Sequence, residues 1–224
     1  MKQRTIILVW KTGGGYTLDD VRLLAFHIHK WSPNTEVLCL TDNPIYNFSS
    51  KLDIGVTFLR MKYEWEGWWS KLNLFSPELE KYRPFLYMDL DTAIVGGLDE
   101  IYPEEDDENR FFITLEDFYQ HGKLASGLMW IPKKTEKLDR LWMEIMRRKG
   151  FGGIGRMDYF LREMIAPDLF FQHYTNSIYS FKPNGRHNFL LEIPEGGAVV
   201  CFHGRPRMKD IKGVEWFNQY IETA

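Results

Sequence analysis

The sequence predicts an α/β fold in which a mainly parallel sheet, with mixed strand directions at its edge, is flanked by helices. Short β-branched and aromatic runs, typical of buried strands, alternate with helix-like segments. The first run, Thr5–Trp10, leads through a glycine-rich loop into a helix, as a nucleotide-binding sheet begins. A later run, Phe85–Met88, is followed by Asp89 and Asp91. A buried strand tolerates charge only where it emerges, so both aspartates are expected at the C-terminal edge of the sheet, where ligands bind.

Length and charge limit the possible functions. The chain has 224 residues, and we expect one domain over residues 1–224, with residues 205–224 as a C-terminal basic turn and helical tail. The formal net charge of −3 argues against a dedicated nucleic-acid binder. The aromatic content of 16% suggests aromatic walls around a ligand.

Two further features bear on localisation. No uninterrupted apolar stretch approaches the ~20 residues needed to span a bilayer, and the apolar run after Arg4 is too short for a signal peptide. Cys39 and Cys201 both lie in apolar runs, as small core residues of a reduced protein do. We therefore expect a cytoplasmic protein without a transmembrane segment.

The remaining elements can be predicted in chain order. Thr17 is the expected N-cap of the first helix, because Asp19 and Asp20 suit its first turn. An amphipathic helix is expected over Lys134–Lys149, and another begins near Asp158. Further strands are predicted at Glu36–Thr41, Val56–Leu59 (as an edge strand), Phe111–Leu115, Leu124–Ile131, Ile178–Lys182 and Ala198–Phe202.

The two aspartates predict a cation site. On extended backbone Asp89 and Asp91 point the same way, while Leu90 points back into the core. Two neighbouring carboxylates repel each other unless a proton or a cation lies between them. A hard divalent ion is the simplest occupant, since magnesium is often held by one or two carboxylates together with substrate phosphates.

This pattern resembles the DxD motif of glycosyltransferases with the A-type (GT-A) fold, which use nucleotide-diphosphate sugars. In those enzymes the motif holds the metal against the pyrophosphate, so the resemblance implies Mn²⁺ or Mg²⁺ as cofactor and Asp89 and Asp91 as ligands. Taken alone, the motif is explained equally well as a solvated turn after a strand. Residues that follow the order of family 8, the glycogenin-like glycosyltransferases, extend the resemblance over nearly the whole chain.

In the N-terminal part, the loop after Trp10 matches neither GxGxxG nor a Walker A sequence. Tyr16 stands where family 8 carries a tyrosine that stacks on uracil; the alternative is a core ring under the helix start. Asp42 ends the second strand, where it could contact the nucleoside or cap the turn. Lys71 occupies the position of a cation that faces the donor phosphates or sugar.

In the middle of the chain, Ser126 and Gly127 resemble the family's Asn-Ser-Gly-Val strand, whose small residues let the donor sugar approach the backbone. Ala125 replaces the asparagine, so one sugar contact is not expected here. Asp158 matches the aspartate of the family's Gly-Asp-Gln helix start, whereas Tyr159 departs from the glutamine. A simple helix cap is the alternative for Asp158.

The last strand ends in a cluster that resembles the family most closely. His203 corresponds to the histidine that completes the metal site, and neutral imidazole is a suitable manganese ligand. Gly204 permits a turn, after which Arg205, Arg207 and Lys209 supply positive charge where a leaving diphosphate gains negative charge. A basic tail after a core strand is the alternative. Cys201 and His203 share a strand face, but two ligands do not make a zinc site.

Together the resemblance implies a metal-dependent glycosyltransferase that moves a sugar from a nucleotide diphosphate, expected to be UDP, to a hydroxyl acceptor with retention of configuration. The expected catalytic residues are Asp158, Arg207 and Lys71. The expected donor-binding residues are Thr12, Gly13, Tyr16, Asp42, Lys71, Asp89, Leu90, Ser126, Gly127, Gly204, Arg205 and Arg207.

Two alternatives come from other functional classes. Haloacid-dehalogenase-type phosphatases use Asp-x-Asp-x-Thr/Val, which would make Asp89 a nucleophile, but Ala93 breaks that pattern. The other is a non-catalytic nucleotide-sugar binding protein. The acceptor stays open among a glycan, a protein side chain, a lipid-linked sugar and a modified nucleobase.

Overall fold

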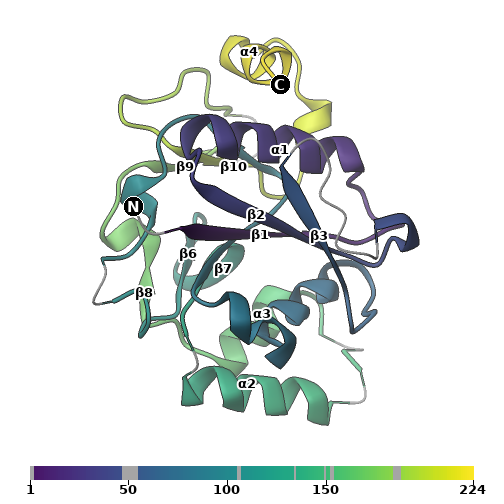
Figure 1. Cartoon of the computed structure of the whole chain (residues 1–224). Coiled ribbons are helices and arrows are strands. Elements are labelled where there is room, and N and C mark those ends of the chain that lie inside the picture. Colours follow the sequence, from purple (N-terminus) through teal and green to yellow (C-terminus); the bar gives the residue numbers. More distant parts are fainter. Residues whose placement is uncertain are drawn as a thin grey trace.

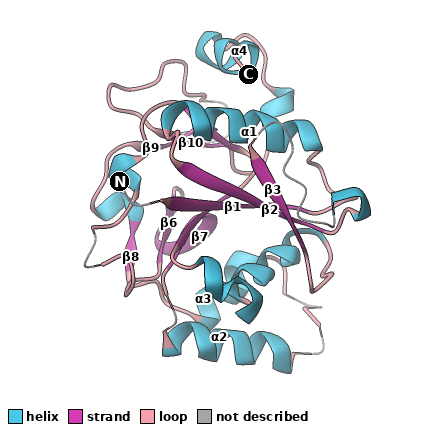
Figure 2. Ribbon diagram, in the orientation of Figure 1, coloured by secondary structure: helices cyan, strands magenta, loops and turns pink. Residues whose placement is uncertain are grey.

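A computed structural model describes residues 3–46, 55–104, 107–133, 135–148, 150–151, 154–183 and 188–224. Strands and helices alternate over most of the chain (Figures 1 and 2). The strands are β1 (Arg4–Trp10), β2 (Thr35–Thr41), β3 (Val56–Arg60), β4 (Phe85–Met88), β5 (Thr92–Ile94), β6 (Ile113–Asp117), β7 (Gln120–Ile131), β8 (Leu169–Phe170), β9 (Ile178–Ser180) and β10 (Val199–Cys201). The α-helices are α1 (Leu18–Trp31), α2 (Glu136–Arg147), α3 (Met157–Met164) and α4 (Glu215–Glu222).

Seven strands form the main sheet, in the order β3-β2-β1-β4-β7-β6-β8. The pairs β1–β2, β2–β3, β1–β4 and β6–β8 are parallel, whereas β7 runs antiparallel to both β4 and β6. The sheet is therefore mainly parallel with an antiparallel insertion, which confirms the predicted fold class. Strand β3 lies at one edge, as its sequence predicted.

Both faces of the main sheet are covered, which explains why its central strands are apolar throughout. In β1, Ile6 and Leu8 pack on the face that α1 covers, and Ile7 packs on the opposite face with residues of α2 and α3. Figure 1 shows α1 on one side of the sheet and α2 and α3 on the other. Helix α1 begins as predicted, because Asp20 accepts a hydrogen bond from the Thr17 backbone N–H at 2.6 Å in a capping box.

A second, three-stranded sheet in the order β5-β10-β9 carries the C-terminal tail. Val200 of β10 and Phe202, which follows this strand, pack with Phe217 and Tyr220 of α4. Strand β10 runs antiparallel to β5 and parallel to β9.

The structure differs from the predicted elements mainly around the aspartate pair. The apolar runs before and after Asp89 and Asp91 belong to different sheets, since β4 lies in the main sheet and β5 in the small one. The predicted helix over Lys134–Lys149 is α2, and both terminal lysines lie outside the described residues. Strand β7 is longer than predicted, extending four residues toward the N-terminus to Gln120.

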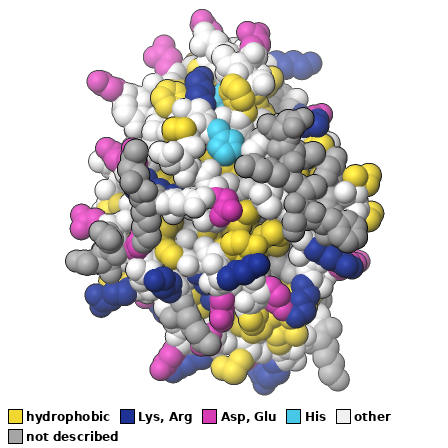
Figure 3. Space-filling model, in the orientation of Figure 1, with side chains coloured by type: hydrophobic (Ala, Val, Ile, Leu, Met, Phe, Trp, Pro, Cys, Tyr) yellow, Lys and Arg dark blue, Asp and Glu magenta, His cyan; other side chains and the backbone are white. Residues whose placement is uncertain are grey.

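Within the described part of the chain, no helix has the length and apolar character needed to cross a membrane. On the face shown in Figure 3, Lys and Arg side chains are interspersed with Asp and Glu side chains. This mixture agrees with the small net charge of −3. Cys39 and Cys201 are both free and buried, as expected of core residues.

Candidate functional site

The aspartate pair lies where the chain passes from one sheet to the other. The backbone N–H of Asp89 donates to the Gly127 carbonyl of the main sheet at 2.9 Å. The Asp91 carbonyl accepts from the backbone N–H of Phe202, which follows β10 of the small sheet, at 2.8 Å. Each aspartate is thus fixed by a different sheet, and the pair marks the C-terminal end of β4 as predicted.

Lys71 lies against Asp89. Its Nζ is 2.5 Å from Oδ1 and 2.7 Å from Oδ2 of Asp89, and the Tyr87 hydroxyl also donates to Oδ1. Burial alone would lower the pKa of Lys71, but the charges of Asp89, Asp158 and Asp91 outweigh it and raise that pKa. Lys71 is therefore a fixed positive charge among three carboxylates.

The negative charge of Asp91 is not fully compensated by its neighbours. Burial and the charge of Asp89 raise the pKa of Asp91 to about 7, against the lowering effects of Lys71 and a hydrogen bond from Tyr16. Burial and the Asp91 charge in turn raise the pKa of Tyr16, so its hydroxyl stays protonated and donates. The site favours a further positive charge or a proton at Asp91.

Asp158 joins the site from α3. Its Oδ1 accepts a hydrogen bond from the Ser126 backbone N–H at 3.0 Å, and its charge acts on Lys71. The predicted residues Ser126, Gly127 and Asp158 therefore lie together beside Asp89. A carboxylate and small backbone groups in this position can accept and approach sugar hydroxyls.

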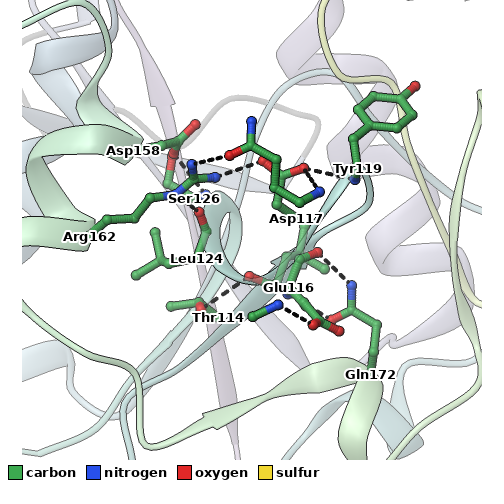
Figure 4. A network of polar contacts seen from close by, with 12 residues as sticks. Thr114, Glu116, Asp117, Tyr119, Leu124, Ser126, Asp158, Arg162 and Gln172 are labelled. Carbon is green, nitrogen blue, oxygen red and sulfur yellow. Dashed lines mark hydrogen bonds and ion pairs between the residues drawn. The ribbon is translucent and has the colours of Figure 1, made fainter. Parts of the chain in front are cut away.

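A polar network holds β7 against α3 and the tip of the β6–β7 hairpin (Figure 4). Arg162 of α3 donates to the Leu124 carbonyl at 2.7 Å and to Asp117 Oδ2 at 2.7 Å. Asp158 and Arg162 are four residues apart, so they lie on the same side of α3 and hold the same stretch of β7. This network fixes the backbone that carries Ser126 and Gly127.

The glycine loop after β1 is tied to the end of β2. Both Asp42 oxygens are engaged, because Oδ1 accepts from the Thr12 N–H at 2.7 Å and Oδ2 accepts from Lys11 Nζ at 2.5 Å. Burial would raise the pKa of Asp42, but these hydrogen bonds outweigh it and lower that pKa. Gly13 has φ of +73°, which favours glycine. Thr12, Gly13 and Asp42 thus lie together, and Asp42 holds the loop in place.

The cationic turn, residues His203–Lys209, approaches the same loop from the other side. The Arg207 Cζ lies 5.4 Å from the centroid of the Tyr16 ring, within cation–π range. A Cβ on Gly15 would lie 1.4 Å from an Arg207 nitrogen, so any other residue here would require the guanidinium to move. Arg205 and Gly204 are exposed, and Leu90 is buried with an apolar side chain that leaves only its backbone for ligand contact.

His203 is held by neighbouring side chains. Its Nε2 lies 2.6 Å from Ser180 Oγ, and its ring stacks on Phe118 at 5.4 Å between centroids. Burial and the nearby Lys182 charge lower the pKa of His203 to about 4, so the imidazole is neutral. Among the described residues, no three His, Cys, Asp or Glu side chains form a preassembled metal site. The ligand role of His203 remains a prediction.

The donor set nevertheless fits a divalent ion that keeps ligands for a substrate. Asp89 and Asp91 offer hard oxygens, and they are close enough that the Asp89 charge raises the pKa of Asp91. Magnesium and manganese commonly take one or two carboxylates and complete their coordination with water and phosphate oxygens. The fit rests on the excess of negative charge at the site, where three carboxylates surround the single ammonium group of Lys71.

Four residues around the site were not predicted. They are Lys11, which binds Asp42; Gly15, which admits Arg207; Tyr87, which binds Asp89; and Lys182, which lies under the cationic turn. Tyr87 could have been found, because residues two apart on a strand point the same way. The other three depend on contacts that no local pattern encodes.

Comparisons with known proteins identify the fold. No protein-family model matches the sequence, and a search of curated proteins finds no match. Among solved structures, the glycosyltransferase GlyE of Streptococcus pneumoniae TIGR4 superposes with a TM-score of 0.69 at 11% identity, covering 99% of this chain and 60% of GlyE. A chain of this length thus spans about three-fifths of GlyE.

Two further structures are similar. An active-site mutant of LgtC gives a TM-score of 0.58 at 11% identity, with 98% of this chain and 95% of that one covered. The bifunctional glycosyltransferase WbbM gives 0.59 at 9% identity, with 97% and 49% covered. At sequence identities of 9% to 11%, the structural similarity shows a shared fold. The chain has the A-type glycosyltransferase fold.

Proposed function

We propose that this protein is a metal-dependent glycosyltransferase that moves a sugar from a nucleotide-diphosphate donor, with UDP as the first candidate, to a hydroxyl acceptor. The observation that carries the proposal is the convergence of Lys71, Asp89, Asp91 and Asp158 at the end of β4. These residues come from segments far apart in the chain, within a fold shared with glycosyltransferases. The membership in family 8 and retention of configuration belong to the proposal as well.

The residues divide the chemistry between them. Asp89 and Asp91 would hold Mn²⁺ or Mg²⁺, which supplies Lewis-acid stabilisation of the diphosphate when bound. Arg207, placed over Tyr16, meets the negative charge that develops on the leaving diphosphate. Lys71 orients the Asp89 carboxylate, and Asp158 with Ser126 forms the floor against which the sugar lies.

The glycine loop after β1 is the proposed binding site of the nucleoside. Asp42 holds the Thr12 backbone and Lys11, so the loop that carries Gly13 and Tyr16 is fixed before a ligand binds. A preorganised loop lowers the entropy cost of ordering on binding. Tyr16 would stack on the base of the nucleotide. A nucleotide-sugar donor also agrees with the similar fold of the galactosyltransferase LgtC, which has been solved with donor and acceptor sugar analogues.

The phosphatase alternative lacks its sequence pattern. Ala93 stands where Asp-x-Asp-x-Thr/Val requires Thr or Val, and the fold is one shared with glycosyltransferases. No observation favours a second function over sugar transfer.

The test is turnover against a panel of UDP-, GDP- and ADP-sugars with Mn²⁺, followed by release of the nucleoside diphosphate. Wild type should release nucleotide with at least one donor, slowly by hydrolysis when the acceptor is missing. Asp91→Asn should remove this activity, whereas Asp99→Asn, at a side chain 93% exposed, is the matched control and should keep it. Metal-dependent binding of a donor without turnover, even with acceptor sugars added, would point to a binding protein instead.

A further inference from the structure

A buried lysine lies beneath the cationic turn. Lys182 follows β9 and is only 2% exposed. Its Nζ donates to the backbone carbonyl oxygens of His203 and Arg205, the latter at 2.9 Å. The first and third residues of the turn are therefore tied to one ammonium group.

Lys182 is itself held in place from two sides. Its backbone N–H donates to Ser180 Oγ at 3.0 Å, and the same hydroxyl lies 2.6 Å from His203 Nε2. Its carbonyl accepts from the Tyr119 hydroxyl at 3.0 Å. Tyr119 lies at the tip of the β6–β7 hairpin, where its backbone N–H donates to Asp117, which also accepts from Arg162 (Figure 4). Lys182 thus connects the turn to the hairpin that α3 anchors.

A lysine in this position is costly to the fold. An ammonium group is rarely buried, because its desolvation must be offset by hydrogen bonds. An apolar side chain of similar length would fill the same space at lower cost, as replacements of buried charges often show. The lysine is therefore explained better by the backbone carbonyl groups that it binds than by its contribution to stability. The turn that it holds carries Arg207, whose guanidinium reaches Tyr16 and the Gly15 loop.

We propose that Lys182 is a positioning residue for the cationic turn. By fixing the carbonyl groups of His203 and Arg205, it sets the path of the backbone that delivers Arg207 to the donor site. Its buried charge also adds to the positive field that a leaving diphosphate meets. The electrostatic role rests on the proposed function, whereas the role of Lys182 in fixing the backbone of the turn does not.

The experiment uses Lys182→Met, which keeps the length of the side chain and removes its charge and donors. Hydrogen exchange in peptides covering residues 203–210 should become at least about tenfold faster, with no change in peptides covering β1 and β2. The kcat for release of nucleotide from a sugar donor should fall about tenfold, with a smaller change in KM. Lys182→Gln, which keeps an N–H donor, should give exchange between that of wild type and that of Lys182→Met.

Lys212→Met is the matched control, because it removes an exposed positive charge from the same tail. Both readouts should stay at the wild-type level. Should Lys182→Met not fold, Tyr119→Phe removes only the hydroxyl that holds Lys182, and faster exchange confined to residues 203–210 is again expected. Unchanged exchange in that segment, or an equal acceleration throughout the molecule, would overturn the inference.

The two proposals can fail separately. If wild type turns over no nucleotide sugar but Lys182→Met still loosens residues 203–210, the proposed function fails and the holding of the turn stands. If wild type is active and Lys182→Met equals it in kcat and in exchange, the inference about Lys182 fails alone.

Discussion

The acidic and cationic halves of the candidate site are held in opposite ways. In the acidic half, Asp89, Asp91 and Asp158 surround Lys71, and side chains bind side chains at the end of the main sheet. In the cationic half, a buried ammonium binds backbone carbonyls of a turn that the small sheet carries. The acidic half is held through side-chain contacts, whereas the cationic half is held through its backbone carbonyl groups.

This difference shows what each half requires from a ligand. The acidic half has three carboxylates and one ammonium, and its excess charge appears in the raised pKa of Asp91. The cationic half has Arg205, Arg207 and Lys209 on the turn with Lys182 beneath it. A diphosphate accompanied by a divalent ion would compensate both halves at once. The predictions test the two halves separately.

The largest effect is expected from Asp91→Asn in the acidic half. Nucleotide release with Mn²⁺ should fall by about 100-fold or more, since Lewis-acid stabilisation is worth several kcal/mol of transition-state energy. Wild type treated with chelator should fall to the same level, and adding Mn²⁺ should restore wild type but not the variant. Equal UDP affinity of wild type in chelator and in Mn²⁺, measured by calorimetry, would remove the metal from the proposal.

Arg207→Ala tests the cationic half at the chemical step. The kcat for nucleotide release should drop by on the order of 10²-fold while the Kd for donor changes much less, because the diphosphate gains charge as the sugar leaves. Lys209→Ala should be milder, since Lys209 is exposed at the end of the turn. An Arg207 variant with wild-type turnover would separate the turn from catalysis.

The sequence predicts the two halves unequally well. The acidic edge could be located because Phe85–Met88 is a clear buried strand and its charged residues must stand at the end. The separation of β4 from β5 could not, since an apolar run shows that a strand is buried but not which sheet it joins. Lys182 was hidden for a similar reason, because a lysine after a strand normally points to solvent.

Contacts over long sequence distances were the other limit. Ser126 and Asp158 could each be chosen by resemblance, but their hydrogen bond joins residues 32 apart and has no local signal. Gly15 leaves the space that the Arg207 guanidinium occupies, although the two residues lie near opposite ends of the chain. Such pairings follow from topology, so the individual residues could be predicted more readily than the network.

Tyr16 lies between the two halves, with its hydroxyl toward Asp91 and its ring under Arg207. If it stacks on the base, Tyr16→Ala should weaken UDP binding in Mn²⁺ by about 1–3 kcal/mol, the range for base–aromatic stacking. Tyr16→Phe keeps the ring and should bind UDP nearly as well as wild type. Unchanged UDP affinity of the alanine variant together with lower thermal stability would assign Tyr16 to the core instead.

The smallest effect concerns stability without a ligand and comes from Asp91 alone. Because the pKa of Asp91 is raised from 3.8 to about 7, the folded protein holds a proton that the unfolded chain releases. The free energy of unfolding should therefore fall as pH rises from about 4 to about 7, and stay lower above that. In chelator at pH 8, Asp91→Asn should be more stable than wild type by on the order of 1–2 kcal/mol, less than the full shift because Asp91 as a residue is only partly buried.

Urea unfolding at a series of pH values measures this difference directly. The gap between Asp91→Asn and wild type should close toward pH 4, where Asp91 is protonated in the folded protein. Asp99→Asn, at an exposed position, should show no such pH-dependent gap. Addition of Mn²⁺ at pH 8 should stabilise wild type and so reduce the difference in unfolding free energy between it and Asp91→Asn. A bound cation compensates the charge of Asp91 as a proton does at lower pH. A gap that is constant from pH 4 to 8 would mean that Asp91 is already compensated within the fold, and the acidic half would then need no cation.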